Sequence, residues 1–298
     1  MIQDDIRRLK IEKNAVILAH YYQDAAVQDI ADFVGDSLEL SKIAAQTEAE
    51  IIVFCGVNFM AETAKILSPK KKVLLPVKEA KCPMAMMISA DQLKQYKQAH
   101  PDRKIVCYVN SYADVKALSD VCVTSSNAEK ILAAFGNEKV LYIPDKNLGR
   151  YLKYKYGYDI ELWPGFCCIH NRLRTSLVRE AKAKHPEALF LVHPEAPLEV
   201  VKLADYVGST RGIIAYATAS PAQEFIIGTE KGILHPLQKA NPGKKFHILT
   251  PDLACFDMKL TTLDDVYHAL RDETFEITVP EEIRKEAYRS LAKMLEMS

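Results

Sequence analysis

The chain has 298 residues, of which 49% are apolar and 26% charged, a composition typical of a globular protein with a large core. Its 39 basic and 39 acidic residues give a formal net charge of zero, so there is no basic field to bind nucleic acid or an anionic membrane. No apolar run reaches membrane-spanning length, and the segment MIQDDIRRLK lacks the apolar core of a signal peptide. We therefore expect a cytoplasmic protein.

In chain order, three segments share one pattern of apolar and polar positions: AVILAHYYQDAAVQDIADFVGDS, KIVCYVNSYADVKALSDVCVTSS and LFLVHPEAPLEVVKLADYVGST. Each predicts a short strand, a polar turn, an amphipathic helix ending at an aspartate, a second apolar stretch and a hydroxyl residue. The aspartates are Asp32, Asp120 and Asp205, and the hydroxyl residues are Ser37, Ser125 and Thr210. The hydroxyl residues are offset by 88 residues (37 to 125) and then by 85 (125 to 210), and the aspartates are offset equally.

The repeat continues beyond these segments. A second strand (EIIVFCG, KVLYIP, EFIIGT), a second helix and a third strand ending at Pro76, Pro164 or Pro251 follow in each copy. Strands that alternate with helices indicate parallel sheets covered on both faces. We predict an α/β fold of three similar α/β/α units around a pseudo-three-fold axis, spanning residues 1–88, 89–173 and 174–298.

Polar side chains follow the first strand of each unit, at His20, Tyr108 and His193, and again two residues later, at Tyr22, Asn110 and Glu195. In open parallel sheets, ligands bind outside the carboxyl ends of the strands. If three such edges face one axis, these side chains converge on a common site. The hydroxyl residues then lie at helix starts, where free backbone N–H groups favour an anion.

Simpler interpretations exist for each residue taken alone. His20 and His193 could be buried, hydrogen-bonded histidines, Glu195 could cap a helix, and His170 could be a surface group. The hydroxyl residues could be ordinary N-caps, and the three aspartates could end helices or structure turns.

The chain has seven cysteines, an odd number that argues against a disulfide framework in a reducing compartment. Cys55, Cys107 and Cys122 lie in apolar strand-like runs and suit inert packing. Cys82, Cys167 and Cys255 instead follow the three strand-ending prolines, so the repeat places one thiol per unit at the expected site. Three thiolates would hold a four-iron cluster with one iron open to substrate, and an open Lewis-acidic metal suits a dehydration.

Short motifs occur along the chain in the following order: ILAHYYQ, DFVGDS, GVNFMAE, KCPMA, YVNS, TSSNA, PDKNLG, GFCCIH, VHPE, DYVGST, GTEKG and CFDMK. The same motifs occur in the same order in the quinolinate synthase family of iron–sulfur enzymes, which the chain resembles over nearly its whole length. The resemblance implies a three-domain α/β fold around one [4Fe–4S] cluster per chain. It also implies condensation of iminoaspartate with dihydroxyacetone phosphate, with loss of phosphate and two waters, to give quinolinate for NAD biosynthesis.

The resemblance carries over to individual residues. It implies that Cys82, Cys167 and Cys255 bind the cluster; the motif Gly-x-Cys-x-x-His selects Cys167 rather than the adjacent Cys168. The active-site residues that match are His20, Tyr22, Ser37, Tyr108, Asn110, Ser125, His170, His193, Glu195, Ser209 and Thr210. Of these, His170 and Ser209 rest on the resemblance alone.

Our mechanistic hypothesis assigns proton transfer to Glu195 and Tyr22, and positioning of substrate to His193 and Tyr108. The hydroxyl residues Ser37, Ser125 and Thr210 would hold the phosphate and the dicarboxylate. A separate aspartate-oxidising enzyme would supply iminoaspartate. The alternatives are an iron–sulfur hydro-lyase of a simpler hydroxy acid, a non-catalytic iron–sulfur sensor, and a zinc site of the three cysteines and His170.

Overall fold

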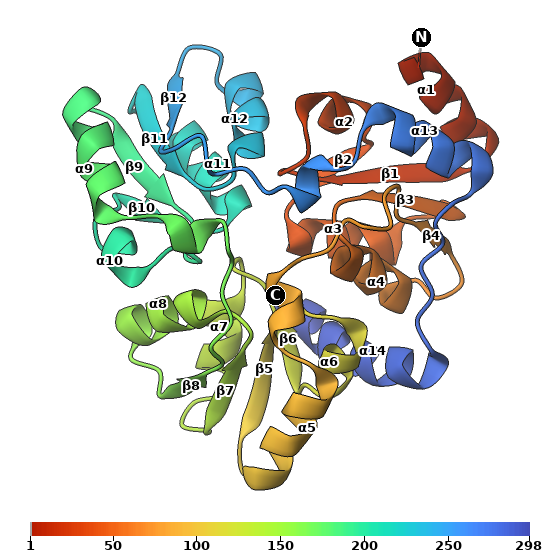
Figure 1. The fold of residues 1–298 in the computed structure, drawn as a ribbon, viewed down its shortest axis with the longest axis horizontal. Coiled ribbons are helices and arrows are strands. Elements are labelled where there is room, and N and C mark those ends of the chain that lie inside the picture. Colours follow the sequence, from red (N-terminus) through yellow and green to blue (C-terminus); the bar gives the residue numbers. More distant parts are fainter. Residues whose placement is uncertain (1) are drawn as a thin grey trace.

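The computed structural model describes residues 2–298 and contains three four-stranded sheets whose strands all run parallel (Figure 1). The strand orders are β2-β1-β3-β4, β6-β5-β7-β8 and β10-β9-β11-β12, so each sheet has the same topology. The predicted fold class, three similar α/β units, is confirmed.

The helices and strands follow the same order in each unit. The first unit contains α1 (Ile2–Glu12), β1 (Ala15–His20), α2 (Ala25–Ile30), β2 (Phe33–Gly35), α3 (Ser37–Gln46), β3 (Ile51–Cys55), α4 (Asn58–Leu67), β4 (Lys72–Leu74) and η1 (Met84–Met87). The second contains α5 (Ala90–Ala99), β5 (Lys104–Tyr108), α6 (Ala113–Ala117), β6 (Val121–Val123), α7 (Ala128–Ala133), β7 (Val140–Ile143), α8 (Lys146–Tyr156), β8 (Ile160–Leu162) and η2 (His170–Arg172). The third contains α9 (Thr175–Lys184), β9 (Leu189–Val192), α10 (Leu198–Val201), β10 (Tyr206–Val207), α11 (Thr210–Ala219), β11 (Glu224–Gly228), η3 (Lys231–Ile233), α12 (Leu234–Ala240), β12 (Lys245–Ile248) and η4 (Asp257–Lys259). Two further helices, α13 (Leu263–Asp272) and α14 (Glu281–Glu296), end the described chain.

The three repeated aspartates have one structural role. Each carboxylate accepts the backbone N–H of a residue fifteen positions earlier in the first strand of its unit, and the backbone N–H of the aspartate donates to the carbonyl of that same residue. The carboxylate distances are 2.8 Å for Asp32 to Ile17, 2.7 Å for Asp120 to Ile105 and 2.7 Å for Asp205 to Phe190. These paired bonds fix the start of the second strand beside the first, as the turn-structuring interpretation expected.

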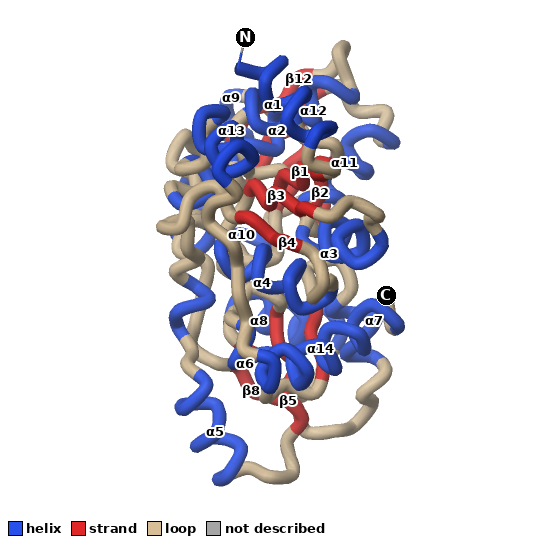
Figure 2. Tube along the Cα trace, turned by 90° about the vertical axis from the view of Figure 1, so that its right-hand side faces the viewer, coloured by secondary structure: helices blue, strands red, loops and turns tan. Residues whose placement is uncertain are grey.

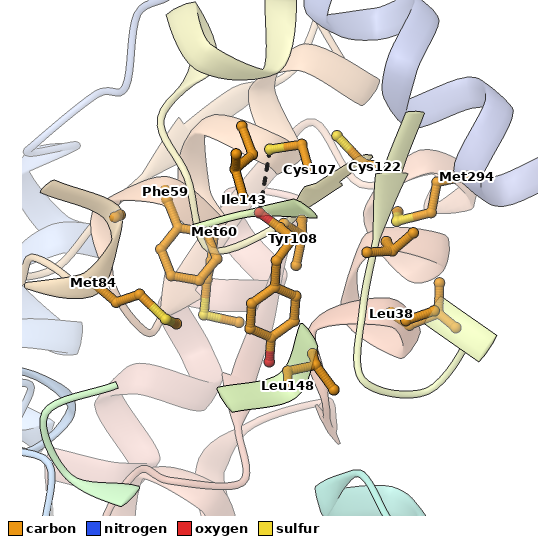
Figure 3. Packing of buried hydrophobic residues seen from close by; sticks show 14 of the residues in the cluster. Leu38, Phe59, Met60, Met84, Cys107, Tyr108, Cys122, Ile143, Leu148 and Met294 are labelled. Carbon is orange, nitrogen blue, oxygen red and sulfur yellow. Dashed lines mark hydrogen bonds between the residues drawn. The ribbon is translucent and has the colours of Figure 1, made fainter. Parts of the chain in front are cut away.

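The strands β1, β3, β5 and β7 are buried along nearly their whole length, as expected for parallel sheets covered by helices. Cys55, Cys107 and Cys122 are 0% exposed within these strands, which is consistent with a packing role. Tyr108, at the end of β5, lies among Met60 and other core residues, and its carbonyl accepts a bond from the Cys107 Sγ at 3.3 Å (Figure 3).

The C-terminal segment packs on the first and second units. After the third unit, α13 packs against α1 and β3, and α14 packs against α6, β6 and α4 (Figures 1 and 2). Between them, Phe275 and Ile277 pair with the edge of β4 through Leu75 N to Phe275 O at 3.0 Å and Ile277 N to Val73 O at 2.8 Å. The segment therefore covers an exposed sheet edge and connects the first unit to the second. The division at residues 88 and 173 stays a prediction.

None of the helices between residues 2 and 298 has both the length and the apolar character needed to cross a bilayer.

We predict that Leu291→Ala lowers the free energy of unfolding by about 2–5 kcal/mol, because Leu291 on α14 is 0% exposed and its loss leaves a cavity between α14 and the second unit. Chemical denaturation measures the change. Tyr288→Ala on the same helix, where the side chain is 46% exposed, is the control and should change stability much less. Equal effects of the two substitutions would contradict the inference that the buried side of α14 stabilises the fold.

Candidate active site

One pocket lies where the carboxyl ends of the three sheets meet, with an empty volume of about 720 Å³ that is partly open to solvent. It is lined by every residue that the sequence analysis placed in the site, except Ser209. These residues are His20, Tyr22, Ser37, Cys82, Tyr108, Asn110, Ser125, Cys167, His170, His193, Glu195, Thr210 and Cys255. The strand ends converge as predicted, while the roles of the individual residues stay predictions.

The first and third units present their histidines in the same way. The Nδ1 of His20 accepts the backbone N–H of Tyr22 at 3.1 Å, and the Nδ1 of His193 accepts that of Glu195 at 3.3 Å. Acceptance at Nδ1 leaves the proton on Nε2, and the Nε2 of His193 donates to Ser125 Oγ at 3.2 Å. Burial lowers the pKa of His20 to about 3 and that of His193 to about 4. Both rings are therefore neutral hydrogen-bond donors near neutral pH.

Glu195 is a buried carboxylate, 4% exposed, that is held from two sides. Tyr108 donates its hydroxyl to Oε1 at 2.7 Å, and His170 Nδ1 lies 2.8 Å from Oε2. Burial opposes ionisation, but the nearby His193 and His170 rings and the hydrogen bonds from His170 and Tyr108 outweigh it and hold the pKa of Glu195 below its usual range. The carboxylate is therefore ionised near neutral pH.

The helix-capping interpretation of Glu195 is wrong, because the next helix, α10, begins at Leu198 and has Pro197 as its N-cap residue. The surface interpretation of His170 is also wrong, since its exposure is 1%.

A second chain of hydrogen bonds joins Tyr22 of the first unit to His170 of the second. Thr229 Oγ1 lies 2.8 Å from both the Tyr22 hydroxyl and His170 Nε2, and Thr210 Oγ1 donates to the Tyr22 hydroxyl at 3.0 Å. Burial, followed by the charge of Glu195, raises the pKa of Tyr22 well above its usual value. The phenol is therefore protonated. Sequence reasoning missed Thr229, although its place directly after β11 was an available signal.

The hydroxyl residues lie at helix starts, but not as caps. Ser37 and Thr210 are the first residues of α3 and α11, whose N-cap residues are Asp36 and Ser209, so the N-cap interpretation is wrong for these two. Ser125 precedes α7 and faces the pocket. The cap side chains already accept the N–H groups of Leu38, Glu39 and Gly212, so the hydroxyls themselves would be the donors to an anionic group.

Ser209 and Asn110 differ in their surroundings. Ser209 Oγ accepts the N–H of Gly212 at 3.1 Å and a bond from Ser126 Oγ at 2.8 Å, outside the pocket lining. Asn110 lines the pocket, and its Oδ1 is buried without a hydrogen-bond partner among the described residues. A buried acceptor of this kind fits a site for a ligand that donates a hydrogen bond.

Each of the three pocket cysteines stands shortly before a 3-10 turn, η1, η2 or η4, so the units present their thiols alike. Burial raises the pKa of the Cys82, Cys167 and Cys255 thiols, for Cys255 to about 12, and for Cys82 and Cys167 the neighbouring thiols add to this rise. Three such thiols become thiolates only when a bound cation compensates their charge. The donor set therefore fits an iron–sulfur cluster.

Two buried carboxylates that sequence reasoning missed orient the cysteine loops. Asp145 Oδ2 accepts the N–H of Cys167 at 3.0 Å, and Glu230 Oε1 accepts that of Cys255 at 3.2 Å. Gly165 lets the Cys167 loop approach the backbone directly after β7, because a Cβ at this position would lie 2.6 Å from the carbonyl oxygen of Pro144. Lys81, beside Cys82, is a further missed residue of the pocket lining.

The geometry does not support one zinc ion held by the three cysteines and His170. Thiolates around a single tetrahedral zinc ion lie about 4 Å apart, given Zn–S bonds of about 2.3 Å. Among the described residues, the group at this pocket whose ligand atoms all lie within 4.8 Å of one another is Cys167, His170 and Glu195, without Cys82 or Cys255. The three thiol sulfur atoms therefore do not all lie within 4.8 Å of one another. Cys168 is half-buried and is not among the residues that line the pocket.

Comparison with known proteins gives one consistent result. A family model described as quinolinate synthetase A protein matches residues 4–296. The quinolinate synthase of Alkaliphilus metalliredigens is 55% identical over 99% of this chain and 97% of its own length. That of Caldicellulosiruptor saccharolyticus is 54% identical over 100% and 98%. Quinolinate synthase 2 of Methanosarcina acetivorans is 46% identical over 100% and 96%.

The lowered pKa values of His20 and His193 predict a defined acid sensitivity of the fold. The unfolded chain binds protons below about pH 6.5, whereas the folded rings stay neutral down to about pH 3 and 4. The free energy of unfolding should therefore decrease as the pH falls from 6.5 towards 4, by up to about 1.4 kcal/mol per pH unit for each ring. Urea denaturation of metal-free protein at several pH values measures the slope. His193→Gln should flatten it, whereas the exposed control His100→Gln should not; a slope unaltered by His193→Gln would refute the assignment.

Proposed function

The chain belongs to the quinolinate synthetase A family, a family of enzymes of NAD biosynthesis, and on that premise we propose that its central pocket condenses iminoaspartate with dihydroxyacetone phosphate into quinolinate. The reaction loses phosphate and two waters. The observation that carries this proposal is the ionised Glu195, held by Tyr108 and His170 in a pocket that also contains three thiols. A proton acceptor beside a metal-binding trio suits a condensation with dehydration.

We propose that Cys82, Cys167 and Cys255 hold one [4Fe–4S] cluster with one iron free of a protein ligand. The group would supply a Lewis acid for the departing oxygen. Asp145 and Glu230 support the assignment, since each orients the backbone of one of these cysteines.

The protein's own side chains would transfer protons and position the substrate. Glu195 would remove a proton and Tyr22 would donate one; the lowered pKa of Glu195 and the raised pKa of Tyr22 show only that the first is ionised and the second protonated before substrate binds. His193, with its Nε2–H on Ser125, and Tyr108, bonded to Glu195, position the substrate and the carboxylate.

The binding groups fit anionic substrates. His20 lines the pocket with its proton on Nε2, and Asn110 offers an unpaired acceptor to a substrate N–H or O–H. Ser37, Ser125 and Thr210 would bind phosphate and carboxylate groups at the starts of their helices. Ser209 would act indirectly, by holding the start of α11.

The chemistry of the substrates suggests the cellular setting. Iminoaspartate is an imine that water hydrolyses, so a nearby aspartate-oxidising enzyme would have to supply it quickly. Seven cysteines without a disulfide among them suit the reducing cytoplasm, which we propose as the compartment. We propose no nucleic-acid or membrane partner.

Anaerobic purification followed by iron, sulfide and product analysis tests the proposal. Iron-loaded protein should form quinolinate and release phosphate from the two substrates. A simple hydro-lyase would release no phosphate, and a sensor would turn over neither substrate. Glu195→Gln should keep its iron and lose about 10²-fold or more in turnover, because the amide cannot accept the proton.

The matched control is Glu199→Gln, on the exposed face of α10 only four residues away, which should retain full turnover. Near-normal turnover of Glu195→Gln would sink the proposed role of Glu195. Full quinolinate formation by protein without iron would sink the proposed cofactor.

The adjacent cysteines allow a second, matched comparison. Cys167→Ala should lose most of its iron and all activity, whereas Cys168→Ala should keep both, because only Cys167 lines the pocket. Cys82→Ala and Cys255→Ala should behave like Cys167→Ala. Iron analysis of the purified variants measures this. Loss of iron in Cys168→Ala, with retention in Cys167→Ala, would show that the ligand is misassigned by one residue.

A further inference from the structure

Two histidines and a glutamate form a compact cluster in the third unit, outside the pocket. His185 is the C-cap residue of α9, Glu224 is the first residue of β11, and His247 lies in β12 (Figure 1 shows these elements). Because Glu224 begins its strand, the cluster lies towards the amino-terminal edge of the sheet, whereas the pocket faces the carboxyl ends. None of the three residues is among those that line the pocket.

The side chains meet at a single carboxylate oxygen. His247 Nε2 lies 2.7 Å and His185 Nδ1 lies 3.0 Å from Glu224 Oε1. The two imidazole rings stack with centroids 3.6 Å apart and an interplanar angle of 19°. The three potential ligand atoms all lie within 4.8 Å of one another.

The cluster is accessible, and the backbone positions of its residues are fixed. The three side chains are 27–31% exposed, so an ion can reach them from solvent. Glu224 and His247 stand on two adjacent strands paired from Glu224 to Lys245, and the backbone N–H of His185 donates to Ala181 O, which fixes it at the end of its helix. Ligands on rigid elements lose little conformational entropy on binding.

The cluster brings two imidazole nitrogens to one carboxylate oxygen, which an ordinary surface pair does not. Hydrogen bonds from His247 and then His185 lower the pKa of Glu224, so one negative charge faces two stacked rings. Protonation of both rings would place two positive charges in a stack 3.6 Å apart. By contrast, His235 shares Asp29 with Lys239, an ordinary surface ion pair that contains one histidine. A divalent cation would satisfy both imidazoles and the carboxylate together.

We propose that His185, Glu224 and His247 bind one divalent transition-metal ion of borderline softness, for which zinc is the representative. Two imidazoles and one carboxylate form a donor set typical of zinc, whereas calcium and magnesium prefer oxygen ligands alone. Binding requires the stacked rings to tilt apart and to place a lone pair on the nitrogen nearest Glu224. Three protein ligands leave the rest of the coordination sphere to water.

The bound ion would link the end of α9 to the strands β11 and β12 through one ligand from each, at the edge of the third sheet away from the pocket. Its effect would be on stability, since an ion that binds only the folded chain raises the unfolding temperature. This inference is independent of the proposed catalytic function.

Zinc binding by the iron-loaded protein tests the proposal. Equilibrium dialysis against zinc, followed by metal analysis, should show one more zinc ion per chain in the wild type than in His247→Gln or His185→Gln. Zinc affinity at this site should fall about tenfold or more in each variant. The unfolding temperature should rise with zinc in the wild type and stay constant in the variants, while iron content and turnover stay at wild-type levels in all of them.

The matched control is His235→Gln, which removes a surface histidine that pairs with a carboxylate but belongs to no such group. It should bind zinc as the wild type does. If His247→Gln is already less stable without zinc, Glu224→Gln, which keeps the side-chain volume, decides instead. Equal zinc content in the wild type and the cluster variants, or loss of a zinc ion in His235→Gln alone, would overturn the proposal.

Discussion

A buried carboxylate at the junction of the three units is the constraint on which the site depends. Glu195 is almost excluded from water, so its charge is tolerable only while Tyr108 and His170 hydrogen-bond to it. Tyr108 and His170 come from the second unit and Glu195 from the third. The same bonds that keep the carboxylate ionised therefore also fix the two units against each other.

The first unit joins this network through neutral groups. Tyr22 reaches Thr229 of the third unit, which in turn contacts His170 of the second. On the same axis, Ser126 Oγ donates either to Asp36 at 2.7 Å or to Ser209 at 2.8 Å, so residues at the starts of one helix from each unit also meet. Polar networks of this kind are stable only when every member is satisfied, and their geometry is correspondingly strict. Substrate would therefore enter a site whose donors are already oriented.

The repeat also explains how one fold can hold dissimilar side chains at equivalent positions. The aspartates that bind the first strands are the same in all three units and have the same hydrogen bonds, because the backbone geometry they support is the same. The residues that follow the first strands vary more: His20 and His193 match, whereas the second unit has Tyr108, and two positions later stand Tyr22, Asn110 and Glu195. Structural positions were thus kept alike, while the positions that face the pocket carry an imidazole, a phenol or a carboxylate.

The sequence by itself determined the three units, the strand-end residues and the one cysteine per unit, because apolar periodicity and regular offsets are local properties that repeat along the chain. Only the tertiary structure revealed which groups Thr229, Asp145 and Glu230 bind, although Thr229 lies directly after a strand. It also decided that α13 and α14 pack on the first and second units. The physical reason is distance along the chain: the Tyr22–Thr229 bond joins residues 207 positions apart, and no periodic pattern encodes which partner a side chain meets after folding.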